Sequence, residues 1–378
     1  MAQILVIDDD PAIQVLLKRA LAKKGYEVEI ASDGEEGLAK AKAMRPALVI
    51  CDWVMPRLSG IEVCRAVKAT PELSTTIFIL LTSMGSVESR VKGLDAGADD
   101  FVCKPVEMFE LNARVRSGLR QHELSRDLQQ QKHRLEAELL EAAEYVRSIL
   151  PEPLLEPPVR IDVRFVPCSR LGGDSFDYFW LDEEHLAIYL LDVSGHGLRS
   201  ALPSLSVINL LRSQSLVQVD YRQPSDVLRN LNDAFQMTQR NDKYFTIWYG
   251  VYNQKTRQLI YASGGHPPAV LISPAGGGLQ VELLKTPGFP AGMFPGVEYV
   301  EQSCEISPAS SLYIFSDGIY EINQTDGEIW GYDNFVDRLK NYQAKLQRNL
   351  DFLIEEVKEV NPRDSFDDDL SIVQIDFE

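Results

Sequence analysis

Short apolar runs alternate with amphipathic helical patterns over the first third of the chain. The apolar runs predict five strands, at 4–7, 27–31, 47–51, 77–82 and 100–103. Helical periodicity predicts helices after them, at 12–24, 34–45, 61–69 and 87–96, with a fifth helix from Met108. Repeats of strand then helix are typical of an α/β domain with a doubly wound, five-stranded parallel sheet, whose carboxyl edge holds the functional residues. We therefore expect a first domain at 1–118.

The helical pattern continues beyond this domain, because no Gly or Pro occurs between 119 and 150. Lys132 interrupts an apolar series with heptad spacing, formed by Leu128, Leu135, Leu139, Ala142, Val146 and Ile149. Pro151 must end this helix, so the pattern predicts a helical connector over 119–158. The connector is either a single helix lying on the next domain or half of a parallel coiled coil that makes a homodimer. The heptad series favours the coiled coil.

The remaining residues, 159–378, predict many strands and a few helices. Strand-like runs occur at 159–166, 176–181, 186–191, 246–253, 259–262, 269–272, 311–316 and 370–375. Helical segments occur at 198–212, 224–240, 332–346 and 350–360. Strands that pair locally around central helices predict an α/β sandwich of two β-sheets flanked by helices.

Composition narrows the class of protein. The 378 residues carry a net charge of −18, which opposes binding to nucleic acid by general electrostatic attraction. The 5 cysteines include no Cys-x-x-Cys pair and the 5 histidines do not cluster, so a zinc site is not expected. The cysteines are best explained as reduced thiols, no apolar run reaches the length of a membrane span, and the N-terminus enters a strand at once. These features predict a cytoplasmic protein.

Polar residues stand where the strands of the first domain end. Asp8 and Asp9 follow the first strand, Asp52 follows the third, Thr82 ends the fourth and Lys104 follows the fifth. At the carboxyl edge of a parallel sheet, such a set forms a site for a metal ion and a phosphoryl group. A carboxylate nucleophile needs a divalent cation to offset charge as the phosphoryl group arrives, and a Lys and a hydroxyl bind phosphate oxygens.

This set resembles that of two-component receiver domains, over about 118 residues. The resemblance implies that a sensor histidine kinase phosphorylates Asp52. It also implies that Mg²⁺ is held by Asp8, Asp9, Asp52 and the backbone carbonyl of Val54.

The same resemblance assigns the other polar residues of this edge. It implies that Thr82 is the switch hydroxyl and that Lys104 binds the phosphate beside a cis Pro105. Phe101 stands where the family places a rotating aromatic residue, often Tyr, so the detail of signal output is expected to differ there.

Four aspartates of the last domain stand beside apolar runs or glycine turns. The run 186–191 ends in Asp192, and the others lie in Gly172-Gly173-Asp174, Ser316-Asp317-Gly318 and Asp367-Asp368-Asp369. For a single Asp an ordinary loop position explains such a place, because Asp is common in turns. Four carboxylates that converge without basic partners would repel one another, so the set indicates a site for cations.

In this order, these motifs and the stretch Gly264-Gly265-His266-Pro267-Pro268 resemble the metal-dependent (PP2C-type) serine/threonine protein phosphatases. The similarity covers about Pro158 to Glu378 and is to the bacterial branch that controls sporulation and stress sigma factors. It implies two Mn²⁺ or Mg²⁺ ions, which lower the pKa of a bridging water so that hydroxide attacks a phosphoserine.

The resemblance also assigns ligands to these ions. Asp192 bridges both, with help from the carbonyl of Val193. The remaining ligands are Asp174, Asp317 and Asp368, with Asp369 as a further candidate. Hard oxygen ligands of this kind fit Mg²⁺ or Mn²⁺ better than Zn²⁺.

Three other residues near these motifs are weaker candidates. Arg170 lies four residues before Asp174 and is either a ligand for the substrate phosphate or a surface residue. His196 is a candidate acid, although it sits in a glycine turn. His266 is expected to be structural.

The leading hypothesis is a response regulator whose receiver controls a protein serine phosphatase that acts on an anti-sigma factor antagonist. One alternative is a phosphatase fold without catalysis that binds a regulatory partner under receiver control, but such an adaptor has no use for a repulsive acidic cluster. A DNA-binding regulator is disfavoured, because there is no basic recognition helix and the connector leads to an acidic domain.

Overall fold

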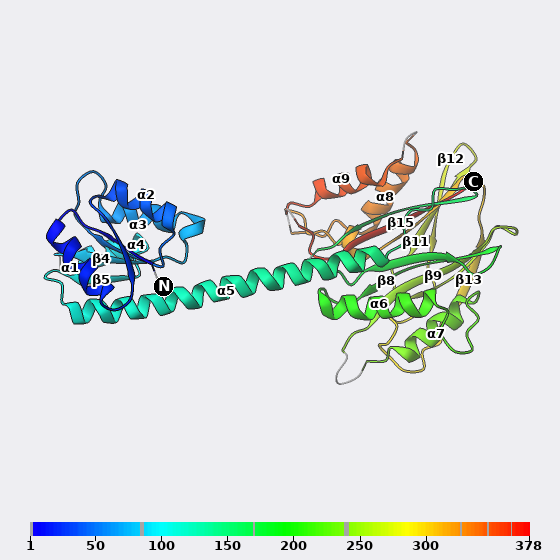
Figure 1. Cartoon of the computed structure of the whole chain (residues 1–378). Coiled ribbons are helices and arrows are strands. Elements are labelled where there is room, and N and C mark those ends of the chain that lie inside the picture. Colours follow the sequence, from blue (N-terminus) through cyan, green and yellow to red (C-terminus); the bar gives the residue numbers. More distant parts are fainter. Residues whose placement is uncertain are drawn as a thin grey trace. The chain divides into compact units, whose positions relative to one another are not determined.

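The computed structural model describes residues 3–83, 87–168, 171–237, 242–325, 327–345, 348–363 and 365–378. The chain divides into two compact units, Met1–Glu136 and Ala137–Glu378. The boundary between them falls within one long helix, labelled α5 in Figure 1. The division into three parts at 118 and 158 stays a prediction.

A five-stranded parallel sheet forms the centre of the first unit, in the order β2-β1-β3-β4-β5. Its strands are β1 (Gln3–Ile7), β2 (Glu27–Ala31), β3 (Leu48–Asp52), β4 (Ile77–Thr82) and β5 (Asp100–Cys103). Its helices are α1 (Pro11–Ala22), α2 (Gly34–Met44), α3 (Gly60–Lys68), α4 (Val87–Asp95) and the start of α5 (Met108–Ile149), with a 3-10 turn, η1 (Pro71–Leu73). The predicted doubly wound fold is confirmed.

Both faces of this sheet are covered by helices. Successive side chains of a strand point to opposite faces, so central strands that are buried on both sides are apolar throughout. On one face Val6 of β1 packs in a cluster with Leu17 of α1 and Leu111 of α5. On the other face Ile7 packs in a cluster with Val63 of α3. The carboxyl ends of the strands, where the polar residues stand, are left at one edge.

The helix α5 belongs to the core of both units. Leu111, near its start, is fully buried against the parallel sheet. In the second unit its residues Ala143 and Val146 pack with Leu171 and Ala201. The helix ends at Ile149, two residues before the proline that was predicted to stop it.

Two antiparallel sheets of five strands each form the second unit. One has the order β13-β10-β9-β8-β7, and the other has the order β12-β11-β14-β15-β6. The first sheet contains β7 (Ser175–Trp180), β8 (His185–Val193), β9 (Phe245–Asn253), β10 (Gln258–Gly264) and β13 (Glu301–Glu305). The second contains β6 (Val159–Val166), β11 (Ala269–Ala275), β12 (Gly278–Leu284), β14 (Ser310–Phe315) and β15 (Leu370–Phe377).

The two sheets pack face to face between two layers of helices (Figure 1). Ile188 of β8 lies with Val373 of β15 in the core between the sheets. The neighbouring residue Tyr189 points to the outer face, where it packs with Val207 in the layer of α6 (Leu198–Arg212) and α7 (Pro224–Ala234). Phe335 belongs to the other outer layer, formed by α8 (Tyr332–Gln343) and α9 (Leu350–Val360). The predicted α/β sandwich is confirmed.

Two strands and one helix end differ from the sequence pattern. The strands β12 and β13 were not predicted. Each lies at the edge of its sheet and is largely exposed. The sequence of β13 is polar, whereas Gln280 and Glu282 interrupt the apolar residues of β12. The helix α7 ends at Ala234, before the predicted end at Arg240. Phe235 leaves the helix and packs edge-on against Phe245, with 5.6 Å between the ring centroids.

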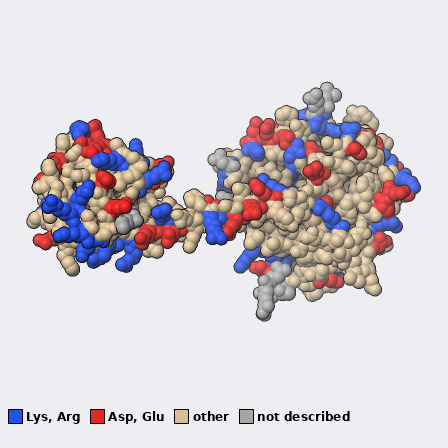
Figure 2. Space-filling view, in the orientation of Figure 1, with Lys and Arg blue, Asp and Glu red and all other residues tan. Residues whose placement is uncertain are grey.

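The surface of each unit carries charges of both signs. Acidic and basic side chains are interspersed on the face that Figure 2 shows. Among the helices of the described residues, none is both long and apolar enough to cross a membrane.

Candidate functional site

The carboxyl edge of the parallel sheet gathers the polar residues predicted for the first unit. The Nζ atom of Lys104, just after β5, lies 2.8 Å from Oδ1 of Asp52 at the end of β3. The same Nζ lies 3.1 Å from Oδ2 of Asp8, just after β1. Three strands of the sheet therefore place one ammonium group between two carboxylates. The peptide bond between Lys104 and Pro105 is cis, as predicted.

Burial shapes the electrostatics of this edge. Asp8 is fully buried, and this burial raises its pKa although hydrogen bonds from Asp10 and Lys104 lower it. For Lys104, burial by itself lowers the pKa, but the hydrogen bonds to Asp52 and Asp8 raise it above its ordinary value. The ammonium form of Lys104 therefore persists beside the two acids at neutral pH.

Three carboxylates at this edge are close enough to share one ion. Ligand atoms of Asp8, Asp9 and Asp52 all lie within 4.8 Å of one another, and Asp9 is exposed to solvent. Thr82, at the end of β4, is buried beside them in the sheet. Val54 follows Asp52 by two residues in the loop after β3, with its side chain 60% exposed. A cluster of carboxylates with one member open to solvent suits a hydrated Mg²⁺ ion.

The second unit brings together the aspartates that the motifs singled out. Asp174 directly precedes β7, and the pairing of Ser175 with Leu191 puts it across from Asp192 on β8. Asp317 follows β14 and begins the 3-10 turn η2 (Asp317–Ile319), while Asp368 lies just before β15. Two neighbouring strands from each sheet therefore deliver carboxylates to one end of the sandwich.

Burial first, and the charges of neighbouring acids second, raise the pKa values of these carboxyls. Burial, together with the charges of Asp317 and Asp368, raises the pKa of Asp192 to about 8. Burial and the charges of Glu321 and Asp368 raise the pKa of Asp317 to about 6. Burial also raises the pKa of Asp174 well above its usual range, with the charge of Asp192 as the next cause. The acids cannot all be ionised here without a compensating positive charge.

Glycines allow the backbone to approach this cluster closely. A Cβ atom on Gly172 would lie 2.5 Å from Oδ2 of Asp369, and one on Gly318 would lie 2.1 Å from the carbonyl oxygen of Asp369. A Cβ atom on Gly173 would lie 2.5 Å from the carbonyl oxygen of Val193. The backbone around the acids thus leaves no room for a side chain at the glycines of the Gly-Gly-Asp and Ser-Asp-Gly motifs.

The residues present fit a site for divalent cations. Asp174 is 2% exposed, and its Oδ2 atom has no hydrogen-bond partner in the described part of the chain. A buried carboxylate oxygen without a partner costs free energy, which a bound cation would recover. The available ligands are carboxylate and carbonyl oxygens, which suit Mg²⁺ or Mn²⁺.

Asp369 differs from the other acids because backbone amides already donate hydrogen bonds to both of its carboxylate oxygens. Its Oδ1 accepts a hydrogen bond of 2.9 Å from the amide of Cys168, and its Oδ2 accepts one of 2.6 Å from the amide of Gly173. Its backbone carbonyl also accepts a hydrogen bond of 3.2 Å from the hydroxyl of Ser316. These contacts fix the loop that carries Asp174. Ligand atoms of Cys168, Asp368 and Asp369 lie within 4.8 Å of one another.

The three weaker candidates have different positions. Arg170 lies outside the described residues. His196 is exposed in the turn after β8. Burial raises the pKa of Asp368, and His196 is only a minor influence against that rise. His266 is 1% exposed, and burial lowers its pKa to about 4, so it is a neutral side chain of the protein interior.

Two residues whose side chains lie at the site belong to none of the motifs found in the sequence. The Nζ of Lys243 donates a hydrogen bond of 2.6 Å to the carbonyl of Ser194, in the turn after β8. The hydroxyl of Ser200 donates a hydrogen bond of 3.1 Å to the same carbonyl. Both contacts end on a backbone atom, so no pattern of side-chain types would have identified them.

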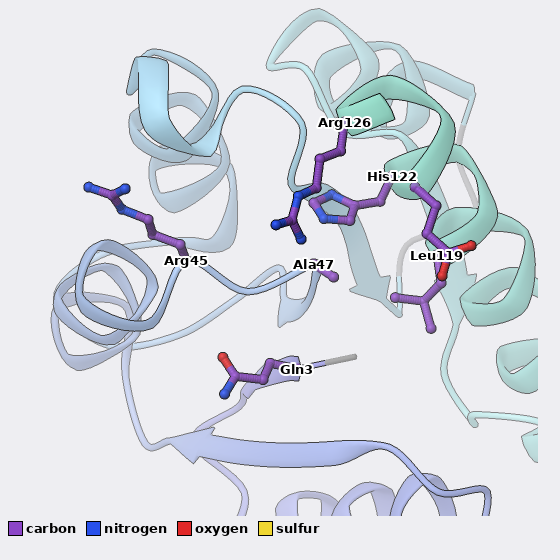
Figure 3. A pocket seen from close by; sticks show the side chains of 7 residues that line it. Gln3, Arg45, Ala47, Leu119, His122 and Arg126 are labelled. Carbon is purple, nitrogen blue, oxygen red and sulfur yellow. The ribbon is translucent and has the colours of Figure 1, made fainter. Parts of the chain in front are cut away.

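A separate pocket of about 420 Å³ opens on the first unit (Figure 3). It is lined by Gln3 and Ala47, which stand at the amino ends of β1 and β3, and by His122 and Arg126 of α5. The residues predicted to bind the phosphoryl group lie at the opposite, carboxyl ends of these strands. This pocket therefore plays no part in the site described above.

Two family models match the chain. The model described as response regulator receiver domain matches residues 4–116, and the model described as stage II sporulation protein E (SpoIIE) matches residues 182–378. The response regulator MprA of Mycolicibacterium vanbaalenii is 48% identical over 118 residues, which are 31% of this chain and 50% of that protein. The chain thus spans about half the length of the curated relatives that it matches.

Solved structures resemble each unit. The SiaA-PP2C domain of Pseudomonas aeruginosa has a TM-score of 0.57 and 20% identity, and the match covers 65% of this chain and 98% of that domain. This likeness is one of fold. The chemotaxis response regulator CheY4 of Vibrio cholerae has a TM-score of 0.31 and 34% identity, and the match covers 31% of this chain and 98% of that protein.

Proposed function

We propose that this chain, which belongs to the family of stage II sporulation protein E and carries a response regulator receiver domain ahead of its PP2C phosphatase domain, is a metal-dependent protein serine/threonine phosphatase controlled by phosphorylation of its receiver. The observation that carries the proposal is the convergence of four carboxyl groups whose pKa values are raised by burial and by neighbouring acids, namely those of Asp174, Asp192, Asp317 and Asp368. Such a cluster is costly to the fold unless cations occupy it.

In the proposed site Asp192 interacts with acids from both sheets, namely Asp174 beside β7 and Asp317 and Asp368 beside β14 and β15. Its carboxylate would bind both cations, and the carbonyl of Val193, which faces Gly173, would support it. Asp174, Asp317 and Asp368 would complete the ligand set, with Mn²⁺ or Mg²⁺ as the cations. When bound, these ions lower the pKa of water toward neutrality and offset the charge of phosphate oxygens. The protein contributes the fixed placement of oxygen ligands on strand ends.

For the receiver, we propose that a sensor histidine kinase transfers its phosphoryl group to a carboxylate oxygen of Asp52. Mg²⁺ held by Asp8, Asp9, Asp52 and the carbonyl of Val54 would offset the charge of the incoming group. The Nζ of Lys104, already 2.8 Å from Oδ1 of Asp52, is placed to bind a phosphate oxygen. Thr82 would bind another and report the change to the rest of the receiver.

The proposed route of control runs through the end of α5. Ala143 and Val146 of this helix pack with Leu171, which directly precedes the Gly-Gly-Asp loop, and with Ala201 of α6. Leu171 also accepts a hydrogen bond of 3.0 Å from the amide of Gly197 in the turn after Asp192. A shift of α5 would therefore act on both loops that carry metal ligands. The proposed substrate is a phosphoserine on an anti-sigma factor antagonist.

We also propose that the chain forms a homodimer through α5. Three leucines that share one stripe of this helix are 65%, 68% and 58% exposed, namely Leu124, Leu128 and Leu135. Exposed leucines at spacings of four and seven are typical of a coiled-coil seam. Light scattering at micromolar concentration should give the mass of a dimer, and a monomer would contradict this part of the proposal.

The phosphatase proposal is tested by hydrolysis of a phosphoserine peptide with and without Mn²⁺. The wild-type protein should release phosphate only with the metal, and Asp192→Asn and Asp317→Asn should each abolish release. Asp367→Asn is the matched control, because Asp367 is exposed and pairs with Asn323 and Arg363 outside the cluster. Full turnover in both cluster variants would refute the proposed mechanism.

A further inference from the structure

We propose that Lys243 is a positioning residue that orients the metal-binding carbonyl of Val193, an inference that rests on the proposed function. Lys243 lies three residues before Thr246, the residue that pairs with Asp192 in the β8–β9 ladder. Its side chain is half-buried, and its Nζ donates a hydrogen bond of 2.6 Å to the carbonyl oxygen of Ser194.

The peptide groups of Ser194 are held from several directions. Its amide donates a hydrogen bond of 3.0 Å to the carbonyl of Tyr244. Its carbonyl accepts the hydrogen bond from Lys243 and a second one, of 3.1 Å, from the hydroxyl of Ser200. Ser200 is itself fully buried. The chain direction at Ser194 is thus set by donors from α6 and from the segment before β9.

The turn that follows needs this support. Gly195 and Gly197 each have a φ of 80°, so the backbone departs from the strand through conformations open mainly to glycine. Glycine supplies the required turn but no rigidity, because it is the most flexible residue in the unfolded and folded chain. A Cβ atom on Gly195 would lie 2.9 Å from Nζ of Lys243, so the ammonium group sits directly against the turn.

The carbonyl before this anchor faces the acid cluster. The carbonyl oxygen of Val193 would be 2.5 Å from a Cβ atom on Gly173, the residue next to Asp174. The Val193 carbonyl shares one rigid peptide group with the amide of Ser194, which donates to Tyr244, and Lys243 and Ser200 hold the next peptide group at its carbonyl. With both groups held, rotation about the two bonds of the Ser194 Cα atom is restricted. The Val193 carbonyl therefore keeps its direction toward the loop of Asp174. Lys243 acts on the metal through this peptide group and needs no contact with the metal itself.

The test compares Mn²⁺ binding by the whole chain in three lysine variants. Lys243→Met removes the donor, Lys243→Arg retains one, and Lys255→Met removes a surface lysine that pairs with Glu184. Loss of an outer-shell partner typically weakens metal binding about 10–100-fold, so Lys243→Met should weaken Mn²⁺ binding by that factor in calorimetry. Lys243→Arg should recover most of the affinity, and Lys255→Met should bind as the wild type does.

Kinetics give a second readout that a purely structural role would not produce. Lys243→Met should lower kcat at limiting Mn²⁺, regain it at excess Mn²⁺, and leave the KM for the phosphopeptide unchanged. If Lys243→Met folds poorly, Ser200→Ala removes the other donor and should give a smaller loss of Mn²⁺ affinity in the same direction. Wild-type Mn²⁺ affinity in Lys243→Met overturns the inference.

Different results would refute the proposed function and the role of Lys243. A wild-type chain whose second unit binds no Mn²⁺ removes the proposed function itself. A wild-type chain that binds Mn²⁺ and hydrolyses the peptide, beside a Lys243→Met variant with equal affinity, leaves the proposed function intact and removes only the role of Lys243.

Discussion

The amide of Gly173 donates a hydrogen bond of 2.6 Å to Oδ2 of Asp369, although 196 positions separate these residues in the chain. This contact closes the acid cluster, because it ties the loop before β7 to the loop before β15. Asp369 has both carboxylate oxygens bound by amides, whereas Asp174 has a buried Oδ2 without a partner in the described residues. The two acids therefore differ in role. Asp369 shapes the loop, and Asp174 is the acid that we propose as a cation ligand.

The first prediction concerns the space beside Asp369. Gly172→Ala should destabilise the second unit by about 1–3 kcal/mol, because its Cβ atom would lie 2.5 Å from Oδ2 of a carboxylate that two amides hold in place. Denaturant unfolding measures the change. Gly278→Ala is the control, since its Cβ atom would meet its nearest neighbour only at 4.0 Å. Equal stability of both variants would mean that the loop moves freely away from Asp369.

The second prediction concerns the repulsion within the cluster. The pKa of Asp192 is raised to about 8, so the stability that depends on its protonated form is present at low pH and is lost as pH rises through about 8. Asp192→Asn places a neutral side chain there. Without metal, this variant should have a higher Tm than the wild type at pH 8, and a similar Tm at pH 4.

Adding Mn²⁺ should instead favour the stability of the wild type over that of Asp192→Asn. Mn²⁺ should raise the Tm of the wild type and leave that of Asp192→Asn nearly unchanged, because binding to the folded state alone shifts stability. Asp367→Asn should respond to Mn²⁺ as the wild type does. A wild type that is no less stable than Asp192→Asn at pH 8 without metal would show that burial and the neighbouring acids do not raise the pKa of Asp192.

The third prediction concerns acid stability at His266. Burial lowers the pKa of His266 to about 4, below the ordinary value of 6.5, so its contribution is fully present above pH 6.5 and is lost as pH falls toward 4. The difference between these two pKa values corresponds to about 3 kcal/mol of folding free energy. His266→Asn keeps a donor for the carbonyl of Pro267, which Nδ1 contacts at 2.9 Å, and should flatten the fall in Tm between pH 6.5 and 4.

The matched control for this experiment is an exposed histidine. His133 has a side chain that is 79% exposed, so His133→Asn should leave the pH dependence of Tm as it is in the wild type. An unaltered slope in His266→Asn as well would indicate that the acid sensitivity of the fold arises elsewhere.

Much of this architecture could be predicted from the sequence because its signals are local. Apolar runs that stop at Asp52 and Asp192 mark strands by their length and mark functional ends by the polar residue that follows. In the structure Asp52 is the last residue of β3, and Asp192 is the last but one of β8. The strand β13, of sequence Glu-Gln-Ser-Cys-Glu, gives no such signal, because an edge strand exposed to water needs no apolar run.

Other features depend on contacts that a side-chain pattern does not contain. Lys243 reads as a surface lysine, yet it binds a backbone carbonyl at the site. Ala142 and Val146 read as part of a seam between two chains, yet they pack in a cluster with Leu171 and Leu205 of the same chain. Heptad spacing indicates an apolar helix face but does not identify what packs against it.

The most direct test of the central claim, that the gathered acids hold a pair of cations, is a calorimetric titration with Mn²⁺. The chain should carry Asp9→Asn and Asp52→Asn, which remove two of the cation ligands proposed for the receiver. We predict that this chain binds about two Mn²⁺ ions and that adding Asp192→Asn abolishes both binding events. A chain that binds no Mn²⁺, or that binds it equally well after Asp192→Asn, would contradict the account.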